Sequence, residues 1–170
     1  MKRTISRSVS AAAVALLAVA TACSDARDPL SPKLQAWNQP PPPQTGELKG
    51  TGTIPDPDGG LIFFDFDVKH DATGTHGSFT GVALFTGETL TASSFTSFTF
   101  GSGFCATASN GDEFQAEGAL AFPGASPAAV TFTIKACDNG PAVVGGDTFS
   151  VDISNGFHAA DAVTGDIQKQ

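Results

Sequence analysis

Apolar and polar residues alternate along several short segments of the chain, which is the pattern of half-buried β-strands. In residues 61–70, LIFFDFDVKH, apolar side chains recur at every second position and charged ones lie between most of them. The alternation returns in residues 129–137, AVTFTIKAC, and in residues 147–154, DTFSVDIS. Because successive side chains of a strand point to opposite faces, each segment predicts a strand with one face in a core and one toward solvent.

Further segments have a weaker form of this pattern, and turn-forming residues separate them. The turns include PDPDGG, ATGTHG, SNGDE and NGFH, which are rich in Gly, Pro, Asn and Asp. Short strands at this spacing predict an all-β domain over residues 47–170, a single antiparallel β-sandwich with a barrel as the alternative. The weaker strand predictions cover residues 47–53, 77–85, 88–100, 103–108, 112–121 and 158–168.

Residues 1–22 have a different pattern, which is typical of a secretory signal peptide. Basic residues at positions 2, 3 and 7 precede a nearly unbroken apolar run from Val9 to Ala20. This run has about 12 residues, whereas a helix needs about 20 to span a membrane. The sequence therefore predicts export of the chain.

The signal peptide ends in the sequence ATAC, and three fates of this segment are open. Signal peptidase can cleave after Ala22 and leave Cys23 as a free thiol, or the segment can stay uncleaved as a short anchor. In the third, the sequence is a lipobox, and the Cys23 sulfur carries a diacylglycerol. ATAC resembles bacterial lipoprotein signals, and exported proteins seldom keep an exposed free thiol, which favours acylation. By the same resemblance, Ser24 after the cysteine implies the outer membrane.

Residues 23–46 predict a disordered tether between the lipid and the domain. They contain four consecutive prolines and few apolar side chains, a composition that favours an extended chain. Removing the signal peptide takes three of the nine basic residues and none of the seventeen acidic ones, so the mature formal charge is −11. Nucleic acids and anionic headgroups repel such a chain. We therefore expect no nucleic-acid partner, and membrane contact through the lipid anchor.

Cys105 and Cys137 are the cysteines that remain for a disulfide. Export places them in an oxidising compartment, where a disulfide persists; two buried free thiols are the alternative. Cys137 lies on the Thr/Lys side of its strand, and Cys105 alternates with residues that face inward. Both side chains should therefore point outward, with residues 103–108 beside residues 130–137 or at a shared sheet edge. A metal site on this pair lacks CxxC spacing and a neighbouring histidine.

The C-terminal part of the chain resembles a known family. Residues 130–154 read VTFTIKACDNGPAVVGGDTFSVDIS, and GDIQ follows at residues 165–168. This succession is similar to the C-terminal half of the post-COAP-type domain, an uncharacterised all-β module of secreted and cell-surface bacterial proteins. The usual Pro-Gly after Asp-Asn-Gly is replaced here by PAVVGG. The resemblance covers about residues 47–170 and implies an accessory surface domain without known catalysis, and it transfers no functional residue.

Two turns rich in aspartate are weak candidates for calcium. The DPDGG turn at residues 56–60 begins like a calcium loop, but Phe66 stands where an EF-hand needs a glutamate. Asp and Asn are also ordinary turn residues, because their side chains hydrogen-bond the local backbone, and structural turns are the alternative for both loops. The second candidate set, in the loop CDNGPAVVGGD, is Asp138, Asn139 and Asp147.

The sequence nominates no catalytic set. Asp65 and Asp67 share a strand face, which we interpret as solvated, because acid–base pairs must oppose each other across a cleft. His70 and His76 flank a turn without a visible third metal ligand, and Gly-x-Ser-x-Gly is absent. We interpret these histidines as exposed loop residues.

These observations lead to one main functional prediction. We expect a non-catalytic, lipid-anchored cell-envelope protein, not an enzyme, that acts as a surface interaction or structural accessory module without a cofactor. The alternatives are a carbohydrate- or calcium-binding surface module and, less favoured, an unrecognised extracellular hydrolase. The sequence names neither a protein nor a polysaccharide partner.

Overall fold

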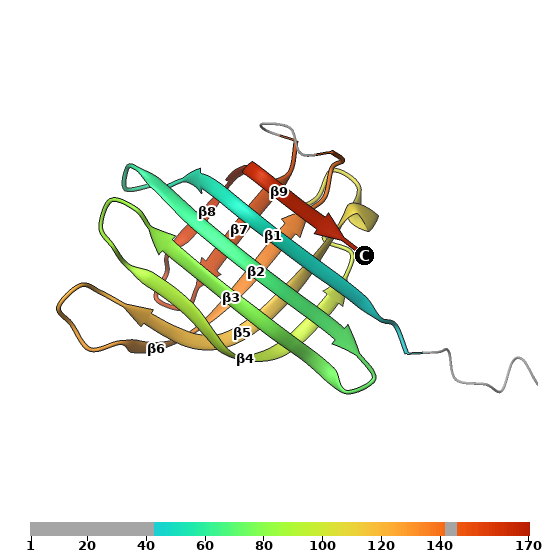
Figure 1. Ribbon diagram of the computed structural model, residues 1–170, viewed down its shortest axis with the longest axis horizontal. Coiled ribbons are helices and arrows are strands. Elements are labelled where there is room, and N and C mark those ends of the chain that lie inside the picture. Colours follow the sequence, from blue (N-terminus) through green and yellow to red (C-terminus); the bar gives the residue numbers. More distant parts are fainter. Residues whose placement is uncertain (1–42, 142–145) are drawn as a thin grey trace, which may run out of the picture. The chain divides into compact units, whose positions relative to one another are not determined.

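A computed structural model describes residues 43–141 and 146–170, and β-strands dominate them (Figure 1). The predicted signal peptide, most of the predicted tether and Cys23 lie outside the described residues. Within the described ranges, no helix has the length and apolar character needed to cross a membrane. The elements are β1 (Gly46–Pro55), β2 (Leu61–Asp71), β3 (Gly74–Ala83), β4 (Thr89–Phe100), the 3-10 turn η1 (Ala108–Asn110), β5 (Gly111–Ala121), β6 (Ala128–Cys137), β7 (Thr148–Ile153), β8 (His158–Ala162) and β9 (Thr164–Lys169).

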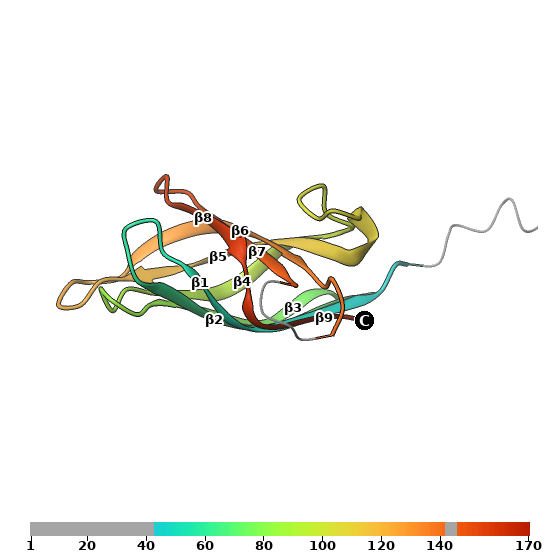
Figure 2. The same cartoon turned by 90° about the horizontal axis from the view of Figure 1, so that it is seen from above.

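All nine strands belong to one antiparallel sheet that follows chain order. Each strand from β1 to β7 pairs with the next one along the chain, and β9 pairs with the other side of β1. Only Val163 separates β8 from β9, so the chain passes from one edge of the sheet to the other in a continuous run. The sheet is therefore curled into a nearly closed barrel, which is flattened into two layers (Figure 2).

The predicted all-β class is confirmed, and one curled sheet supplies both layers. The strong alternation of residues 61–70 holds in β2, where Ile62, Phe64, Phe66 and Val68 are buried. The other two strongly alternating segments form β6 and β7. The barrel predicted as the alternative describes this architecture more closely than two separate sheets do.

Aromatic rings from opposite walls of the barrel fill the core. Phe64 on β2 and Phe149 on β7 stack with ring centroids 4.0 Å apart and planes 3° apart. Phe66 packs against Phe149 and against Phe114 of β5, with centroids 6.1 Å and 5.8 Å apart. Burying a phenylalanine contributes roughly 1.5–3 kcal/mol, so these rings are a main source of cohesion between the two layers.

Glycines allow β9 to approach β1 where the chain crosses between the sheet edges. Gly52 pairs with Gly165, and a Cβ on Gly165 would lie 2.2 Å from the Thr51 carbonyl oxygen. Gly165 also has a φ of +153°, and a Cβ on Gly52 would lie 2.7 Å from the Val163 side chain. A larger residue at either position would push the two strands apart, so the close pairing of β9 with β1 requires both glycines.

Two of the weaker strand predictions need correction. Residues 103–108, predicted as a strand, lie instead in the loop before β5. Local hydrogen bonds hold this loop, because Ser102 N–H donates to the Ala108 carbonyl at 3.0 Å and Cys105 N–H donates to the Ser102 carbonyl at 3.1 Å. The single strand predicted for residues 158–168 is divided into β8 and β9, because the chain changes its pairing partner at Val163.

The predicted disulfide between Cys105 and Cys137 is confirmed, with Cα atoms 5.6 Å apart. Cys137 ends β6 on the face opposite the core residue Ala136, as its parity predicted, but it is fully buried. The loop that carries Cys105 covers this face, so the disulfide joins a loop to a strand and not two neighbouring strands. Gly111 of β5 makes room for it, since a Cβ there would lie 2.2 Å from the Cys105 Sγ.

Removing the disulfide should destabilise the barrel measurably. The sequence separation of the two cysteines is 32 residues, and releasing a loop of this length from its cross-link costs about 3–4 kcal/mol in the chain-entropy model. We expect a Cys105→Ala/Cys137→Ala variant to lose that much unfolding free energy in urea titration. As a control, a reductant should lower the urea midpoint of the wild type and leave that of the variant unchanged. Equal midpoints for the two oxidised proteins would contradict the expectation.

Candidate functional site

One end of the barrel opens into an apolar cavity. The turns that join β1 to β2, β3 to β4, β5 to β6 and β7 to β8 gather at this end, on the left of Figure 1. Between them lies a partly open cavity of about 230 Å³ that reaches the core. We call it the open-end cavity. Its apolar lining includes Ile62, Phe64, Phe79, Leu90, Phe149 and Val151.

A glycine on β3 leaves part of this space free. Gly81 lines the open-end cavity, next to Phe79 on the same strand and opposite Leu90 on β4. A Cβ on Gly81 would lie 3.5 Å from the Phe79 ring and 3.8 Å from the Leu90 Cβ, which are ordinary contact distances. A side chain at this position would therefore occupy the cavity without a clash in the barrel wall.

Exposed apolar side chains lie in the turns next to the lining of the cavity. Leu84 and Phe85 lie in the turn between β3 and β4, and 82% of Phe85 is exposed to solvent. Leu84 N–H donates a hydrogen bond of 2.8 Å to the carbonyl of Leu61, which ties this turn to the start of β2. Phe122 is exposed directly after β5. Apolar side chains gathered at an opening are typical of a surface that binds an occupant.

The charged groups at the mouth are acidic. Asp58 and Glu88 line the open-end cavity together with Asn155, and none of the described lining residues is basic. Asp58 belongs to the DPDGG turn, where its N–H donates to the Asp56 carboxylate at 3.0 Å. That turn is thus held by the local hydrogen bond that aspartate typically makes.

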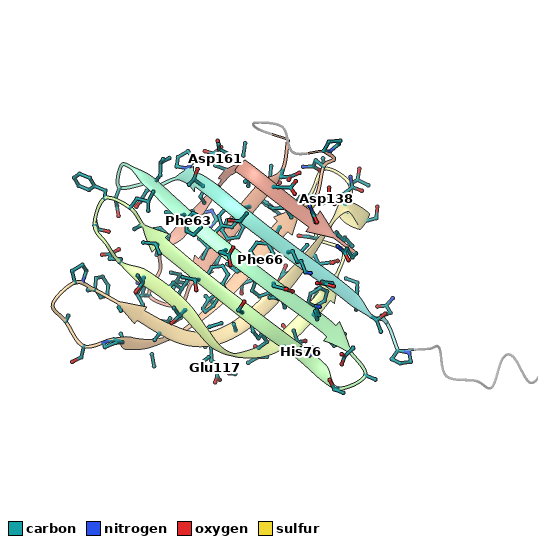
Figure 3. The ribbon with its side chains drawn as sticks, in the orientation of Figure 1. Phe63, Phe66, His76, Glu117, Asp138 and Asp161 are labelled. Carbon is teal, nitrogen blue, oxygen red and sulfur yellow. A yellow bond between two sulfur atoms is a disulfide. The ribbon has the colours of Figure 1, made fainter. Side chains whose placement is uncertain are left out.

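The second calcium candidate set lies at the opposite end of the barrel, where Figure 3 labels Asp138 near the end of β9. The Asp147 carboxylate accepts hydrogen bonds from Asn139 N–H at 2.9 Å and from Ile167 N–H at 2.7 Å. The Asp138 carboxylate accepts from Gly140 N–H and from Lys169 N–H, each at 3.1 Å. Ile167 and Lys169 lie on β9, and their N–H groups point away from β1. We call the hydrogen bonds from these two N–H groups to Asp147 and Asp138 the β9 seam. A calcium ion would have to replace these bonds.

A charged pair links the same end of β9 to β5. Lys169 donates from Nζ to the buried carboxylate of Asp112 at 2.6 Å and to the Gly111 carbonyl at 3.1 Å. The Asp112 carboxylate also accepts from Gly101 N–H at 2.8 Å. Because one partner is fully buried, this contact fixes Lys169 against the wall of the barrel.

The paired aspartates of β2 lie on the outer surface. Asp65 is exposed, and Asp67 lies 3.7 Å from Lys49 Nζ on the neighbouring strand β1. Lys49 also pairs with Glu47, and its hydrogen bond holds the pKa of the Glu47 carboxyl below its ordinary value. The two aspartates therefore face solvent and a lysine rather than each other across a cleft, as a solvated strand face predicts.

His70 and His76 lie apart from the open-end cavity, whereas His158 follows the lining residue Phe157 at the start of β8 without lining the cavity itself. His70 and His76 stand on the adjacent strands β2 and β3 near their shared turn, not in a loop. His158 on β8 contacts the Asp152 carboxylate at 2.6 Å. Among residues 43–141 and 146–170, no three His, Cys, Asp or Glu side chains come together in a way that could hold a metal ion.

Comparison with known proteins adds no relative. No protein-family model, curated protein or solved structure matches the chain. The resemblance of residues 47–170 to the post-COAP-type domain stays a prediction.

The open-end cavity is the feature that sequence reasoning missed. Its lining comes from five different strands and from the turns beside them, and the alternation pattern marks the strand residues only as core. One local signal was present: the turn ALFTGE places Leu84 and Phe85 where hairpin turns are ordinarily polar.

Breaking the β9 seam should destabilise the protein. Asp147→Ala leaves the N–H groups of Asn139 and Ile167 without their acceptors, at a cost of about 1–3 kcal/mol each, so we expect a loss of about 2–6 kcal/mol in unfolding free energy. Urea titration measures it. The matched control is Asp65→Ala on the exposed face of β2, with an expected change below about 0.5 kcal/mol. Equal effects of the two substitutions would show that the carboxylate of Asp147 does not hold the seam.

Proposed function

We propose that the chain is a non-catalytic, lipid-anchored protein of the bacterial cell envelope, and that its barrel is a binding module. The observation that carries the proposal is the open-end cavity, together with the exposed Leu and Phe side chains in the turns next to its lining. A concave apolar site with a few polar groups at its rim is the usual form of a small-ligand site. An occupant would remove both the cavity wall and the exposed rim from water.

The envelope location is supported by two features of the chain. The ATAC sequence places Cys23 where lipoproteins carry their acyl groups, and Ser24 favours the outer membrane. The disulfide between Cys105 and Cys137 suits an oxidising compartment outside the cytoplasm. An exported, lipid-anchored chain accounts for all three cysteines.

The geometry of the barrel is compatible with an anchor that precedes it. The described chain enters β1 at the end where Glu47 N–H donates to the Gln170 carbonyl, at 3.0 Å. This end lies opposite the turns around the open-end cavity (Figure 1). The point at which the described chain enters the barrel is therefore at the end away from the mouth of the cavity.

Acylation at Cys23 can be tested by radiolabelled palmitate in the native bacterium. We expect the wild-type protein to incorporate the label and to sediment with membranes, and Cys23→Ala to lose both properties. Cys105→Ala is the matched control, since it removes a thiol and keeps the proposed anchor, so it should stay labelled. An unlabelled wild type, or a Cys23→Ala protein that remains membrane-bound, would overturn the localisation.

Binding at the open end can be tested with an uncharged solvatochromic dye. We expect the dye to bind the unacylated Cys23→Ala chain with blue-shifted emission, because the cavity removes it from water. Adding Gly81→Val places three carbons in the cavity, about a third of its volume at roughly 25 Å³ per carbon, and should weaken dye binding at least tenfold. The matched control is Gly103→Val, where a Cβ meets nothing within 4 Å. Dye binding that is equal in both variants would contradict a role for the cavity.

A further inference from the structure

We infer that the open-end cavity takes a single alkyl chain of medium length whose polar end carries no negative charge. This inference rests on the proposed binding function and names the chemical class of the ligand. It depends on three properties of the site: the volume of the cavity, the apolar character of its depth and the charge at its rim.

The volume limits the occupant to a narrow hydrocarbon. An apolar cavity of about 150 Å³ holds a benzene ring, which corresponds to about 25 Å³ for each of the ring carbons. At that figure the volume of about 230 Å³ accommodates about nine carbons. A fused-ring lipid or a second acyl chain would not fit, whereas one alkyl chain fits end-on.

The depth of the cavity determines which end of the ligand enters first. Phe64, Phe79 and Phe149 are the lining residues farthest along their strands from the turns; all three are buried and apolar, and they bring no hydrogen-bonding side chain to the bottom of the site. The hydroxyl groups of a sugar would lose their hydrogen bonds to water there without replacement, which is costly. The alkyl end therefore enters first, and the polar end stays at the mouth.

The rim sets the preferred charge of the polar end. Asp58 and Glu88 place two carboxylates at the mouth, and no described lining residue is basic. A carboxylate or phosphate on the ligand would approach like charges, whereas an ammonium group would approach opposite ones. The order of affinity should therefore be cationic, then uncharged, then anionic.

The apolar rim extends the contact beyond the cavity. Phe85 lies against the turn between β1 and β2, since a Cβ on Gly60 would lie 3.0 Å from the Phe85 Cβ. Leu84 and Leu61 are joined by a backbone hydrogen bond next to it. Carbons of a chain that protrudes from the cavity would pass over these side chains, so chains somewhat longer than about nine carbons should still gain affinity.

The test is a competition series against the uncharged dye, with the unacylated Cys23→Ala chain and ligands kept below their micelle concentrations. We expect alkyltrimethylammonium ions to displace the dye, with affinity rising roughly three- to fourfold per added methylene until the chain passes the rim. Decanol should bind more weakly than decyltrimethylammonium, and decanoate at least tenfold more weakly. Added salt should narrow the difference between the charged ligands, because it screens the carboxylates at the rim.

Variants separate the contributions of depth and rim. Adding Gly81→Val should abolish displacement by every alkyl ligand, whereas adding Gly103→Val should leave the series unchanged. An Asp58→Asn/Glu88→Gln pair of substitutions should keep chain binding and bring decanoate close to decyltrimethylammonium. A charge preference that persists in that variant would overturn the assignment of the rim.

The outcomes distinguish this inference from the proposed function. If the dye binds but alkyl chains do not displace it, or if decanoate binds as well as the cationic chain, the ligand class is wrong and the binding module stands. Displacement by an oligosaccharide in place of alkyl chains has the same meaning. If neither the dye nor any alkyl chain binds the folded protein, the proposed binding function fails as well.

Discussion

The barrel depends on the way its last strand closes it. β8 and β9 form one run with Val163 between them, and this run leaves β7 to pair with β1. Strand β9 pairs with a neighbouring strand on one side only, so its remaining N–H groups need other acceptors if they are to avoid the cost of unsatisfied polar groups. The carboxylates of Asp138 and Asp147 supply these acceptors in place of a neighbouring strand. Without these carboxylates, the N–H groups of Ile167 and Lys169 on this edge would lose their acceptors.

The two ends of the barrel consequently differ in the interactions that they contain. At one end, the β9 seam, the Lys169–Asp112 pair and the disulfide hold loops and strands together through polar and covalent bonds. At the other end, hairpin turns surround an apolar cavity, and Phe85 is left exposed. A rigid end and an open end suit a binding module, because the first fixes the wall that the second presents to a ligand.

Much of this fold could be predicted from local patterns, and the remainder depends on contacts that local patterns do not encode. The alternation in residues 61–70 identified the buried face of β2, because a strand has the same period whatever it packs against. The division at Val163 was missed, since it arises from a change of pairing partner and not from a change in the pattern. The strand predicted for residues 103–108 was wrong, because these residues form a loop. The alternation of side chains around Cys105 indicates the side to which it points only if the segment is a strand. The disulfide itself was correct.

The candidate site residues could likewise be predicted only where their role depends on local sequence. Asp138 and Asp147 were singled out as calcium candidates because their loop is rich in Asp and Asn. A loop whose carboxylates accept hydrogen bonds from N–H groups has the same amino-acid composition as a loop that binds an ion. Their hydrogen bonds to β9 join residues far apart in the chain, which spacing alone does not reveal. The open-end cavity includes the space beside Gly81, which Phe79 and Leu90 border. This space arises only when the strands have packed into a barrel, so the sequence pattern does not show it.

The pairing of β1 with β9 also determines when the barrel can form. Leu48 pairs with Lys169, so the two strands that complete the ring are the most distant in the chain, and bringing distant segments together slows folding. If the polypeptide crosses a translocation channel with its amino end first, β1 emerges before β9 and can pair with β2 alone. The barrel could therefore close only after almost the whole chain had crossed.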